Sequence, residues 1–178
     1  MTHLTTATPE VAHMAGIQQL FALRPETAAP LQALAQQLLR GPSSLTPAER
    51  ETIAALVSFD NDCTYCARSH EAAACALTGD RQIVERAREL ATSMTPKMQA
   101  LCAIAHKVAR GGKNVGVDDV AAARAAGADD VAIHDTVLVA AAFCMFNRYV
   151  DGLAAPTPEP GPAYAMMGQR LAGQGYLR

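Results

Sequence analysis

Hydrophobic residues recur with the period of an α-helix along almost the whole chain. Between residues 25 and 40, for example, Leu31, Leu34, Leu38 and Leu39 fall on one face of a helix. No stretch alternates hydrophobic and polar residues with the period of two that a half-buried strand shows. The pattern therefore predicts an all-α fold.

Residues that begin and end helices divide this pattern into segments. Thr46, Pro47 and Glu49 have the order of a capping box with proline in the first turn, and Gly79 is placed to end a later helix. The expected helices are 8–23 (a short helix or a loop), 25–40, 47–59, 63–77, 81–91, 95–110, 118–126, 129–153 and 163–172.

Alanine supplies 37 of the 178 residues, and tryptophan is absent. Half of the chain is hydrophobic by count, but much of that half is alanine, so bulky core side chains are scarce. Small side chains favour closely packed helices and leave one subunit little bulk for a core of its own. We therefore expect a homo-oligomer that buries further surface between copies.

Length and proline content suggest one domain with an appended arm. A chain of 178 residues suffices for one compact domain. We expect this domain, N-terminal helices included, to span residues 1–155. The prolines that alternate with other residues from 156 to 162 favour a stiff extended linker, so residues 156–178 are interpreted as a Pro-rich C-terminal arm that packs elsewhere.

Charge and hydropathy argue against several classes of protein. The formal net charge of −2 lacks the basic excess that nucleic-acid binding needs. The longest apolar run, 137–146, is far shorter than the roughly 20 residues of a membrane span, and the first residues lack the features of a signal peptide. Five cysteines are an odd number and do not suggest a secreted disulfide framework. We therefore expect a cytoplasmic protein with no nucleic-acid or membrane partner.

One segment carries reactive side chains at an informative spacing. Cys63, Cys66 and His70 are separated by three and then four residues, which places them on one face of a helix. An ordinary thiol has a pKa near 8.5 and is mostly protonated at pH 7, so a nucleophilic cysteine needs a base or a positive charge beside it. His70 offers that base to Cys66, while the helix N-terminus favours a thiolate at Cys63.

Glu51 precedes Cys63 by twelve residues, on the preceding expected helix. If the break at 60–62 folds the two helices into a hairpin, Glu51 faces His70, where a carboxylate fixes the imidazole tautomer and raises its basicity. These parts suit a thiol peroxidase or a disulfide reductase, in which the second cysteine converts a sulfenic acid into a disulfide.

Two other interpretations of the motif stay open. The CxxC pair with His70 offers three zinc ligands, and a fourth would come from an acid or another cysteine, as in a structural zinc-binding oligomer. In the second interpretation, Cys63 and Cys66 are unreactive core residues and His70 lies near them by chance. The remaining cysteines lie in apolar helical surroundings and are expected to be unreactive; they are Cys75, Cys102 and Cys144.

The motif resembles the core of the carboxymuconolactone decarboxylase superfamily, in its alkylhydroperoxidase AhpD-like, peroxidase-related branch. The resemblance rests on residues 46–51, the Cys63-Thr-Tyr-Cys66 pair and His70, and the segment 146–151 looks like the family's closing helix. It covers roughly residues 20–153. The resemblance implies an AhpD-like helical bundle that assembles into trimers or hexamers.

The same resemblance implies a mechanism. A hydroperoxide would be the substrate, no cofactor or metal would be bound, and an external dithiol or disulfide reductant, a protein or a small molecule, would restore the thiols. In the family's peroxidases a glutamate relays a proton through the motif histidine and a water to the second cysteine. Applied to this sequence, the resemblance implies that Glu51 and His70 form the relay. Cys66 would attack the peroxide, and Cys63 would convert the resulting sulfenic acid into a disulfide.

Two details qualify that assignment. Tyr65 stands where some AhpD peroxidases have a second histidine, and tyrosine is a poor base at pH 7. The helix dipole favours Cys63 as nucleophile, but it contributes only about 1 kcal/mol or less, so the spacing to His70 decides for Cys66. Lactone decarboxylation is not expected, because the decarboxylase branch generally lacks the CxxC pair.

The chain is therefore predicted to be a thiol-dependent alkylhydroperoxide reductase. The alternative is a disulfide reductase or redox sensor with little peroxidase activity, followed by the structural zinc-binding oligomer.

Overall fold

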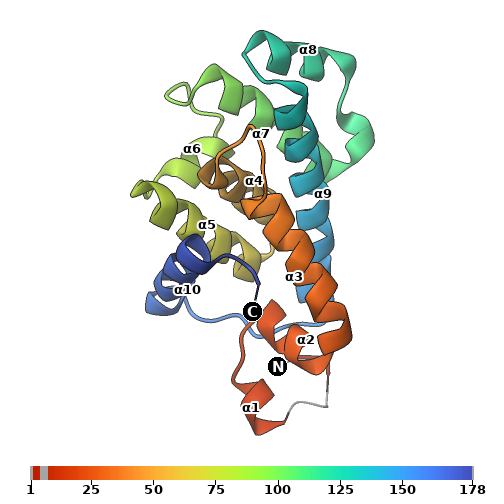
Figure 1. The fold of residues 1–178 in the computed structure, drawn as a ribbon, viewed down its shortest axis with the longest axis vertical. Helices are drawn as coiled ribbons and strands as arrows, with labels where there is room; N and C mark the ends of the chain where they lie inside the picture. Colours follow the sequence, from red (N-terminus) through yellow and green to blue (C-terminus); the bar gives the residue numbers. More distant parts are fainter. Residues whose placement is uncertain (1, 5–7, 178) are drawn as a thin grey trace.

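The computed structural model describes residues 2–4 and 8–177, and within these ranges every regular element is helical, which confirms the predicted all-α class. Figure 1 shows an elongated bundle with α8 at one end of the long axis and α1 and α2 at the other. In chain order the helices are α1 (Pro9–Ala12), α2 (Ile17–Leu23), α3 (Pro25–Arg40), α4 (Pro47–Asp60), α5 (Thr64–Thr78), α6 (Ile83–Arg88), α7 (Pro96–Arg110), the 3-10 helix η1 (Gly112–Asn114), α8 (Val117–Ala125), α9 (Asp130–Gly152) and α10 (Pro162–Gln174).

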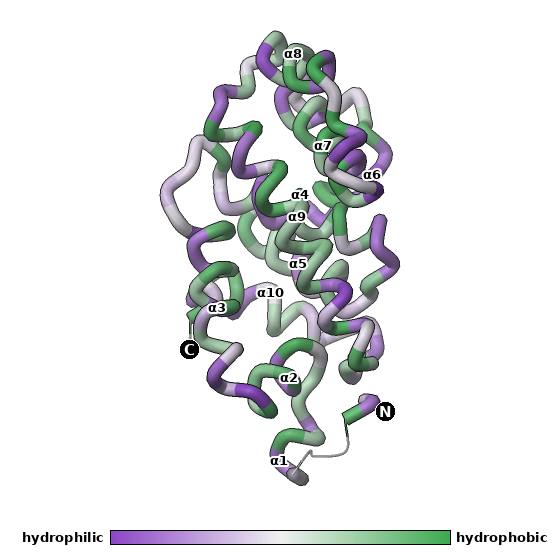
Figure 2. Tube along the Cα trace, turned by 90° about the vertical axis from the view of Figure 1, so that its right-hand side faces the viewer, coloured by the Kyte–Doolittle hydropathy of each residue, from purple (hydrophilic) through white to green (hydrophobic). Residues whose placement is uncertain are grey.

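The core is built around α4 and α9. Helix α4 is buried along most of its length and contacts α5, α7 and α9. Alanines without exposed surface, such as Ala54, Ala105 and Ala140, belong to these core helices, because small side chains let helices approach closely. Figure 2 shows these central helices mostly in pale and hydrophobic colours, with hydrophilic residues toward the outer turns.

Helix α9 is the one described helix whose length and composition would allow it to cross a membrane. Half of its apolar window is buried inside the fold, where it packs against α4 and α7. A core helix of a bundle needs the same apolar character, so these contacts account for it.

The predicted capping box is present at the start of α4. Thr46 Oγ1 accepts a hydrogen bond from the Glu49 backbone N–H over 3.2 Å, and the Thr46 N–H donates to Glu49 Oε2 over 2.8 Å. These two bonds satisfy N–H groups that the first turn of a helix leaves without partners. The register of α4, and with it the direction of Glu51, is set at this cap.

A tight turn at residues 61–62 folds α5 back along α4. Asp62 adopts a left-handed conformation with φ of 56°. Asn61 Nδ2 donates to Asn147 Oδ1 over 2.9 Å, and Asn147 Nδ2 donates to Ser58 Oγ over 3.0 Å. This network ties the end of α4 to α9 and fixes the hairpin.

Two of the expected helices are shorter than the hydrophobic pattern suggested. The segment 8–23 divides into α1 and α2, because Gly16 has φ of 53° and even a methyl group there would collide with the Tyr65 ring. The expected helix 81–91 ends at Arg88, and Leu90 has φ of 50°. Positive φ is incompatible with a continuing right-handed helix.

The segment that follows α9 returns to the bundle, and α10 packs along α5 of the same chain (Figure 1). The two helices approach most closely at Gly168, where a Cβ would lie 2.5 Å from the Ala72 backbone. The segment interpreted as an arm therefore covers the helix that carries the CxxC motif.

Candidate functional site

Helix α5 carries three of the four residues singled out from the sequence. Cys63 is its N-cap residue, Cys66 lies in its first turn, and His70 follows one turn later. All three are buried or nearly so, with exposed fractions of 0%, 4% and 8%. Both thiols are free in this structure. The residues expected on one helix face therefore lie along the buried side of α5.

Glu51 projects from α4 onto His70. Its Oε2 lies 2.7 Å from His70 Nδ1, and its side chain has no exposed surface. The α4–α5 hairpin thus produces the Glu–His contact that the twelve-residue spacing predicted. With Nδ1 donating to the carboxylate, the Nε2 lone pair of His70 is left to accept a proton.

Two further side chains meet the other oxygen of Glu51. Arg40 Nη2 lies 2.6 Å from Glu51 Oε1, and the Tyr176 hydroxyl donates to the same oxygen over 2.5 Å. Arg40 comes from the end of α3 and Tyr176 from the segment after α10. The buried carboxylate therefore accepts from three donors, which is the usual requirement for a buried charge.

These donors decide the protonation of the network. Burial by itself would raise the pKa of Glu51, but His70, Arg40 and Tyr176 together bring it below its usual value of 4.5. Burial and the adjacent Glu51 carboxylate raise the pKa of Tyr176 well above 10. Glu51 is therefore ionised and Tyr176 is a neutral donor at neutral pH.

His70 is also held by aromatic contacts. The edge of its ring meets Phe143 at 4.5 Å between centroids, and the Tyr176 ring stacks on it at 6.0 Å with an interplanar angle of 11°. The Arg40 guanidinium in turn lies over the Tyr176 ring, 5.2 Å from its centroid. The imidazole is thus fixed in orientation by both hydrogen bonding and packing.

The two thiols differ in environment. The neighbouring Cys66 and burial, with a smaller contribution from the Asp151 charge, raise the pKa of the Cys63 thiol strongly. Cys63 is fully buried, whereas Cys66 lines a cavity together with His70. Cys63 is therefore held as a thiol, and Cys66 is the sulfur that a ligand in the cavity meets first.

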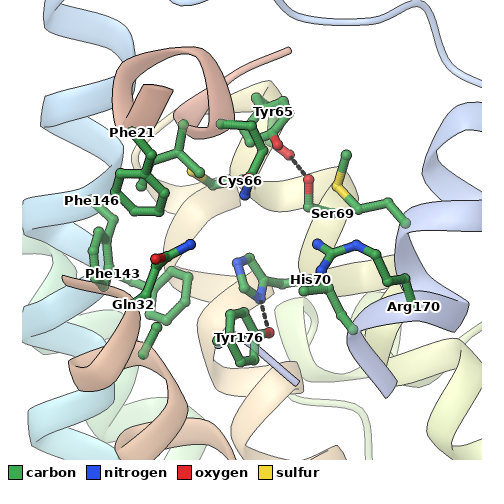
Figure 3. Close-up of a pocket in the computed structure, with 15 residues that line it drawn as sticks. Phe21, Gln32, Tyr65, Cys66, Ser69, His70, Phe143, Phe146, Arg170 and Tyr176 are labelled. Atoms are coloured by element: carbon green, nitrogen blue, oxygen red, sulfur yellow. Dashed lines mark hydrogen bonds between the residues drawn. The ribbon is translucent and has the colours of Figure 1, made fainter. Parts of the chain in front are cut away.

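The cavity lies between α2, α3, α5, α9 and α10 and has a volume of about 60 Å³. Figure 3 shows Cys66 and His70 on one wall, with Phe21, Phe143 and Phe146 facing them. A water molecule occupies about 30 Å³ in the liquid. The space therefore suits a few heavy atoms beside the Cys66 sulfur.

Tyr65, inside the CxxC, does not supply a second base. Burial, followed by the neighbouring Cys66 and Tyr164, raises the pKa of its hydroxyl beyond the usual value of 10. Its ring contributes to the cavity wall and packs against Gly16. The role of this residue in the site is therefore one of packing.

The other cysteines lie away from this cluster. Burial raises the pKa of Cys102 to about 12, in keeping with an unreactive thiol. Cys144 receives a weak hydrogen bond from Asn61 over 3.5 Å. Among the described residues, no three His, Cys, Asp or Glu side chains gather in an arrangement suited to a metal ion.

Three residues of the site were missed in the sequence: Arg40, Arg170 and Tyr176. Arg40 ends a helix, where a basic residue is common, and nothing local sets it apart. Arg170 and Tyr176 belong to the expected arm, far from the motif in sequence. The tail holds two tyrosines, Tyr164 and Tyr176, and nothing in the sequence tells which of them reaches the site.

Known proteins with a similar sequence or structure share the helical fold described above. Residues 25–107 match the carboxymuconolactone decarboxylase family. The structure is similar to that of an uncharacterized peroxidase-related protein from Silicibacter sp. TM1040, with a TM-score of 0.79 and 26% identity over 92% of this chain and 94% of that one.

A second similar structure, from Ralstonia eutropha JMP134, is described as an alkylhydroperoxidase AhpD core and an uncharacterized peroxidase-related protein. It has a TM-score of 0.76 and 23% identity over 90% of this chain and 84% of that one, which shows a shared fold. No curated protein matches the chain.

Proposed function

Because the chain belongs to the AhpD-like part of the carboxymuconolactone decarboxylase superfamily, we propose that it is a thiol-dependent hydroperoxide reductase. The observation that carries this proposal is that Cys66 and His70 line one cavity while Glu51 holds the far nitrogen of His70. A nucleophile, a base and a residue that orients the base are the parts of nucleophilic catalysis.

In the first step Cys66 attacks the terminal oxygen of the hydroperoxide. His70 Nε2 takes the thiol proton, directly or through a water, and the thiolate forms an S–O bond as the O–O bond breaks. The alkoxide that leaves receives the proton from His70 and departs as an alcohol. Cys66 is then a sulfenic acid.

In the second step Cys63 attacks the oxidised sulfur. An S–S bond forms between residues 63 and 66, the S–O bond breaks, and hydroxide leaves with the Cys63 proton as water. Their i, i+3 positions at the start of α5 keep the two side chains close. An external dithiol then reduces the disulfide by thiol–disulfide exchange and becomes oxidised itself.

The hydrogen bonds to Glu51 favour a positioning role for this residue over a role as a proton carrier. Its two oxygens accept from Arg40, Tyr176 and His70. A carboxylate held by three donors is a weak proton acceptor, so Glu51 orients His70 and stabilises its protonated form. In this proposal His70 is the group that carries the proton, and no bound cofactor or metal takes part.

The test follows thiol oxidation and peroxide consumption together. With a small dithiol as reductant, the wild-type protein is expected to consume tert-butyl hydroperoxide catalytically, and one 63–66 disulfide per chain is expected when peroxide is added without reductant. Cys66→Ser should abolish both. Wild-type rates from a Cys66→Ser protein, or a peroxide reaction no faster than that of free cysteine, would contradict the proposal.

The second candidate is a disulfide reductase or redox sensor with little peroxidase activity. It is favoured by one observation, the absence of a second base at Tyr65. It predicts rapid exchange of the 63–66 pair with protein or small-molecule disulfides but slow reaction with peroxide. Stopped-flow oxidation by the two classes of oxidant separates the candidates.

A further inference from the structure

A positive charge faces the same cavity from the opposite helix. Arg170 projects from α10 and lines the space together with Cys66 and His70. Figure 3 shows its guanidinium directed toward the side of the cavity where His70 and Ser69 lie. The proposed reaction as written so far gives this residue no task.

Within residues 2–4 and 8–177, no hydrogen bond or ion pair joins Arg170 to a carboxylate. The acidic residue of the site, Glu51, is already met by Arg40, His70 and Tyr176. Arginine is a strong and geometrically selective partner for carboxylates. The Arg170 guanidinium is therefore available to bind a carboxylate of a ligand in the cavity.

The remaining walls suit a substrate with a small apolar body. Phe21, Phe143, Phe146 and Met167 supply apolar surface. The volume of about 60 Å³ is well below the roughly 150 Å³ of a cavity that binds benzene, so the fitting molecule is small and aliphatic.

We propose that the cavity selects small aliphatic hydroperoxides that carry a carboxylate, with Arg170 as the specificity-determining residue. The carboxylate binds the guanidinium on α10 while the hydroperoxide meets Cys66 on α5. This proposal rests on the proposed hydroperoxide reductase function and adds a substrate class to it.

A matched pair of substrates tests it. For 3-hydroperoxypropanoate, which is unbranched, and its methyl ester, the wild-type kcat/KM is expected to favour the acid by about tenfold or more, the range of a charge-assisted hydrogen bond. Arg170→Gln should remove this preference, because kcat/KM for the acid falls by about tenfold more than kcat/KM for the ester or for tert-butyl hydroperoxide. Arg170→Lys should keep part of the preference, because the positive charge remains but the paired N–H donors of the guanidinium are lost.

The control variant is Arg68→Gln, which removes the same charge from the outer face of α5, where Arg68 pairs with Glu71. It should leave the acid preference intact. An equal loss of rate for acid and ester in Arg170→Gln would assign the arginine to activation of the Cys66 thiolate and would overturn the substrate class. A wild-type protein without acid preference would overturn it as well.

Binding separates failure of this proposal from failure of the proposed reaction. Calorimetry with 3-hydroxypropanoate, the alcohol that the reduction would release, requires no turnover. The wild-type and Arg68→Gln proteins are expected to bind it about tenfold or more tightly than Arg170→Gln does. Equal affinities in all three proteins would refute the role of Arg170, whether or not any peroxide is reduced.

Discussion

The hydroxyl of Tyr176 donates a 2.5 Å hydrogen bond to Oε1 of Glu51, across 125 positions of sequence. It joins the segment after α10 to the hairpin of α4 and α5. The CxxC motif, its base and the carboxylate behind the base all belong to that hairpin. The tail adds the third donor to the carboxylate and part of the cavity wall, so the candidate site is complete only when α10 is docked.

Tyr176→Phe isolates this hydrogen bond, since the ring that stacks on His70 is retained. Tyr176 is one of the groups that lower the pKa of Glu51, so its removal lets that pKa rise and allows Glu51 to take up a proton at higher pH. We expect kcat/KM for a hydroperoxide at pH 7 to fall by about three- to tenfold. This is less than the full contribution of a hydrogen bond to a charged group, because the phenol acts on the reaction only through Glu51 and His70. The acid limb of the pH–rate profile should move toward higher pH.

Tyr164→Phe is the matched control. Tyr164 is a buried tyrosine of α10 whose hydroxyl donates to Pro158 O over 3.3 Å, outside the cavity. It should change neither the rate nor the position of the acid limb. A Tyr176→Phe profile that overlays the wild-type profile would show that the phenol is structural only.

Cys63→Ser should stop the reaction at its first intermediate. Cys66 and His70 remain, so the O–O bond is still cleaved, but no thiol resolves the sulfenic acid. We expect one equivalent of peroxide to be consumed per chain, followed by loss of turnover with a dithiol. Trapping with dimedone and mass spectrometry should place the adduct on Cys66, and an adduct on another cysteine would reassign the nucleophile.

Glu51→Gln should change stability in a pH-dependent way. The pKa of Glu51 in the folded protein lies below its usual value of 4.5, so the stabilisation from its ionised form is present above that pH and is lost as pH falls through the lower folded value. The variant leaves the largely buried Arg40 guanidinium without its carboxylate partner and should unfold with about 3 kcal/mol less free energy at pH 7. Urea unfolding should show this difference shrinking below about pH 4, whereas a constant difference would contradict the assignment.

Gly168→Ala tests the docking of α10 on α5. A methyl group at 168 would come within 2.5 Å of the Ala72 backbone, so the helices must separate. We expect a loss of about 1–3 kcal/mol in the free energy of unfolding. Gly173→Ala is the control, because it lies in the same helix with open space around it and should gain up to about 1 kcal/mol from helix propensity. Equal effects of the two variants would mean that α10 tolerates displacement.

The expected homo-oligomer has a candidate surface on α9. Val131, Leu138 and Met145 are partly exposed and spaced by seven residues, so they form one apolar stripe along this helix. We propose that a second copy covers it. Light scattering at micromolar concentration should give a multiple of 18.7 kDa for the wild type and a smaller mass for Leu138→Asp. A monomeric wild type would end this proposal.

Local patterns were sufficient to predict most of the helices and the part of the candidate site that lies on α4 and α5. The capping box at Thr46 and Glu49 and the 63–66–70 spacing depend on residues within one or two turns, where sequence distance and spatial distance agree. The Glu51–His70 contact needed one further assumption, a hairpin at 60–62, and the turn at Asn61 and Asp62 supplies it.

The long-range contacts of the site could not be predicted from the sequence, for a physical reason. Arg40 and Tyr176 reach Glu51 only after three helices have packed, and no periodicity records which helix ends will meet. The split at Gly16 had the same origin, because the ring that it avoids belongs to Tyr65, nearly fifty residues away.

The burial of Cys63 has a consequence for the return half of the cycle. A reductant that enters from the cavity reaches the Cys66 sulfur first, and it must then expel Cys63 as the leaving group. The contribution of Cys66 to the raised pKa of the Cys63 thiol is lost once the Cys66 sulfur is bonded to the reductant. Burial still raises that pKa, so the expelled thiolate is a poor leaving group and the disulfide resists reopening. We therefore expect reduction, rather than peroxide cleavage, to limit turnover, and a low-potential dithiol to be the effective electron donor.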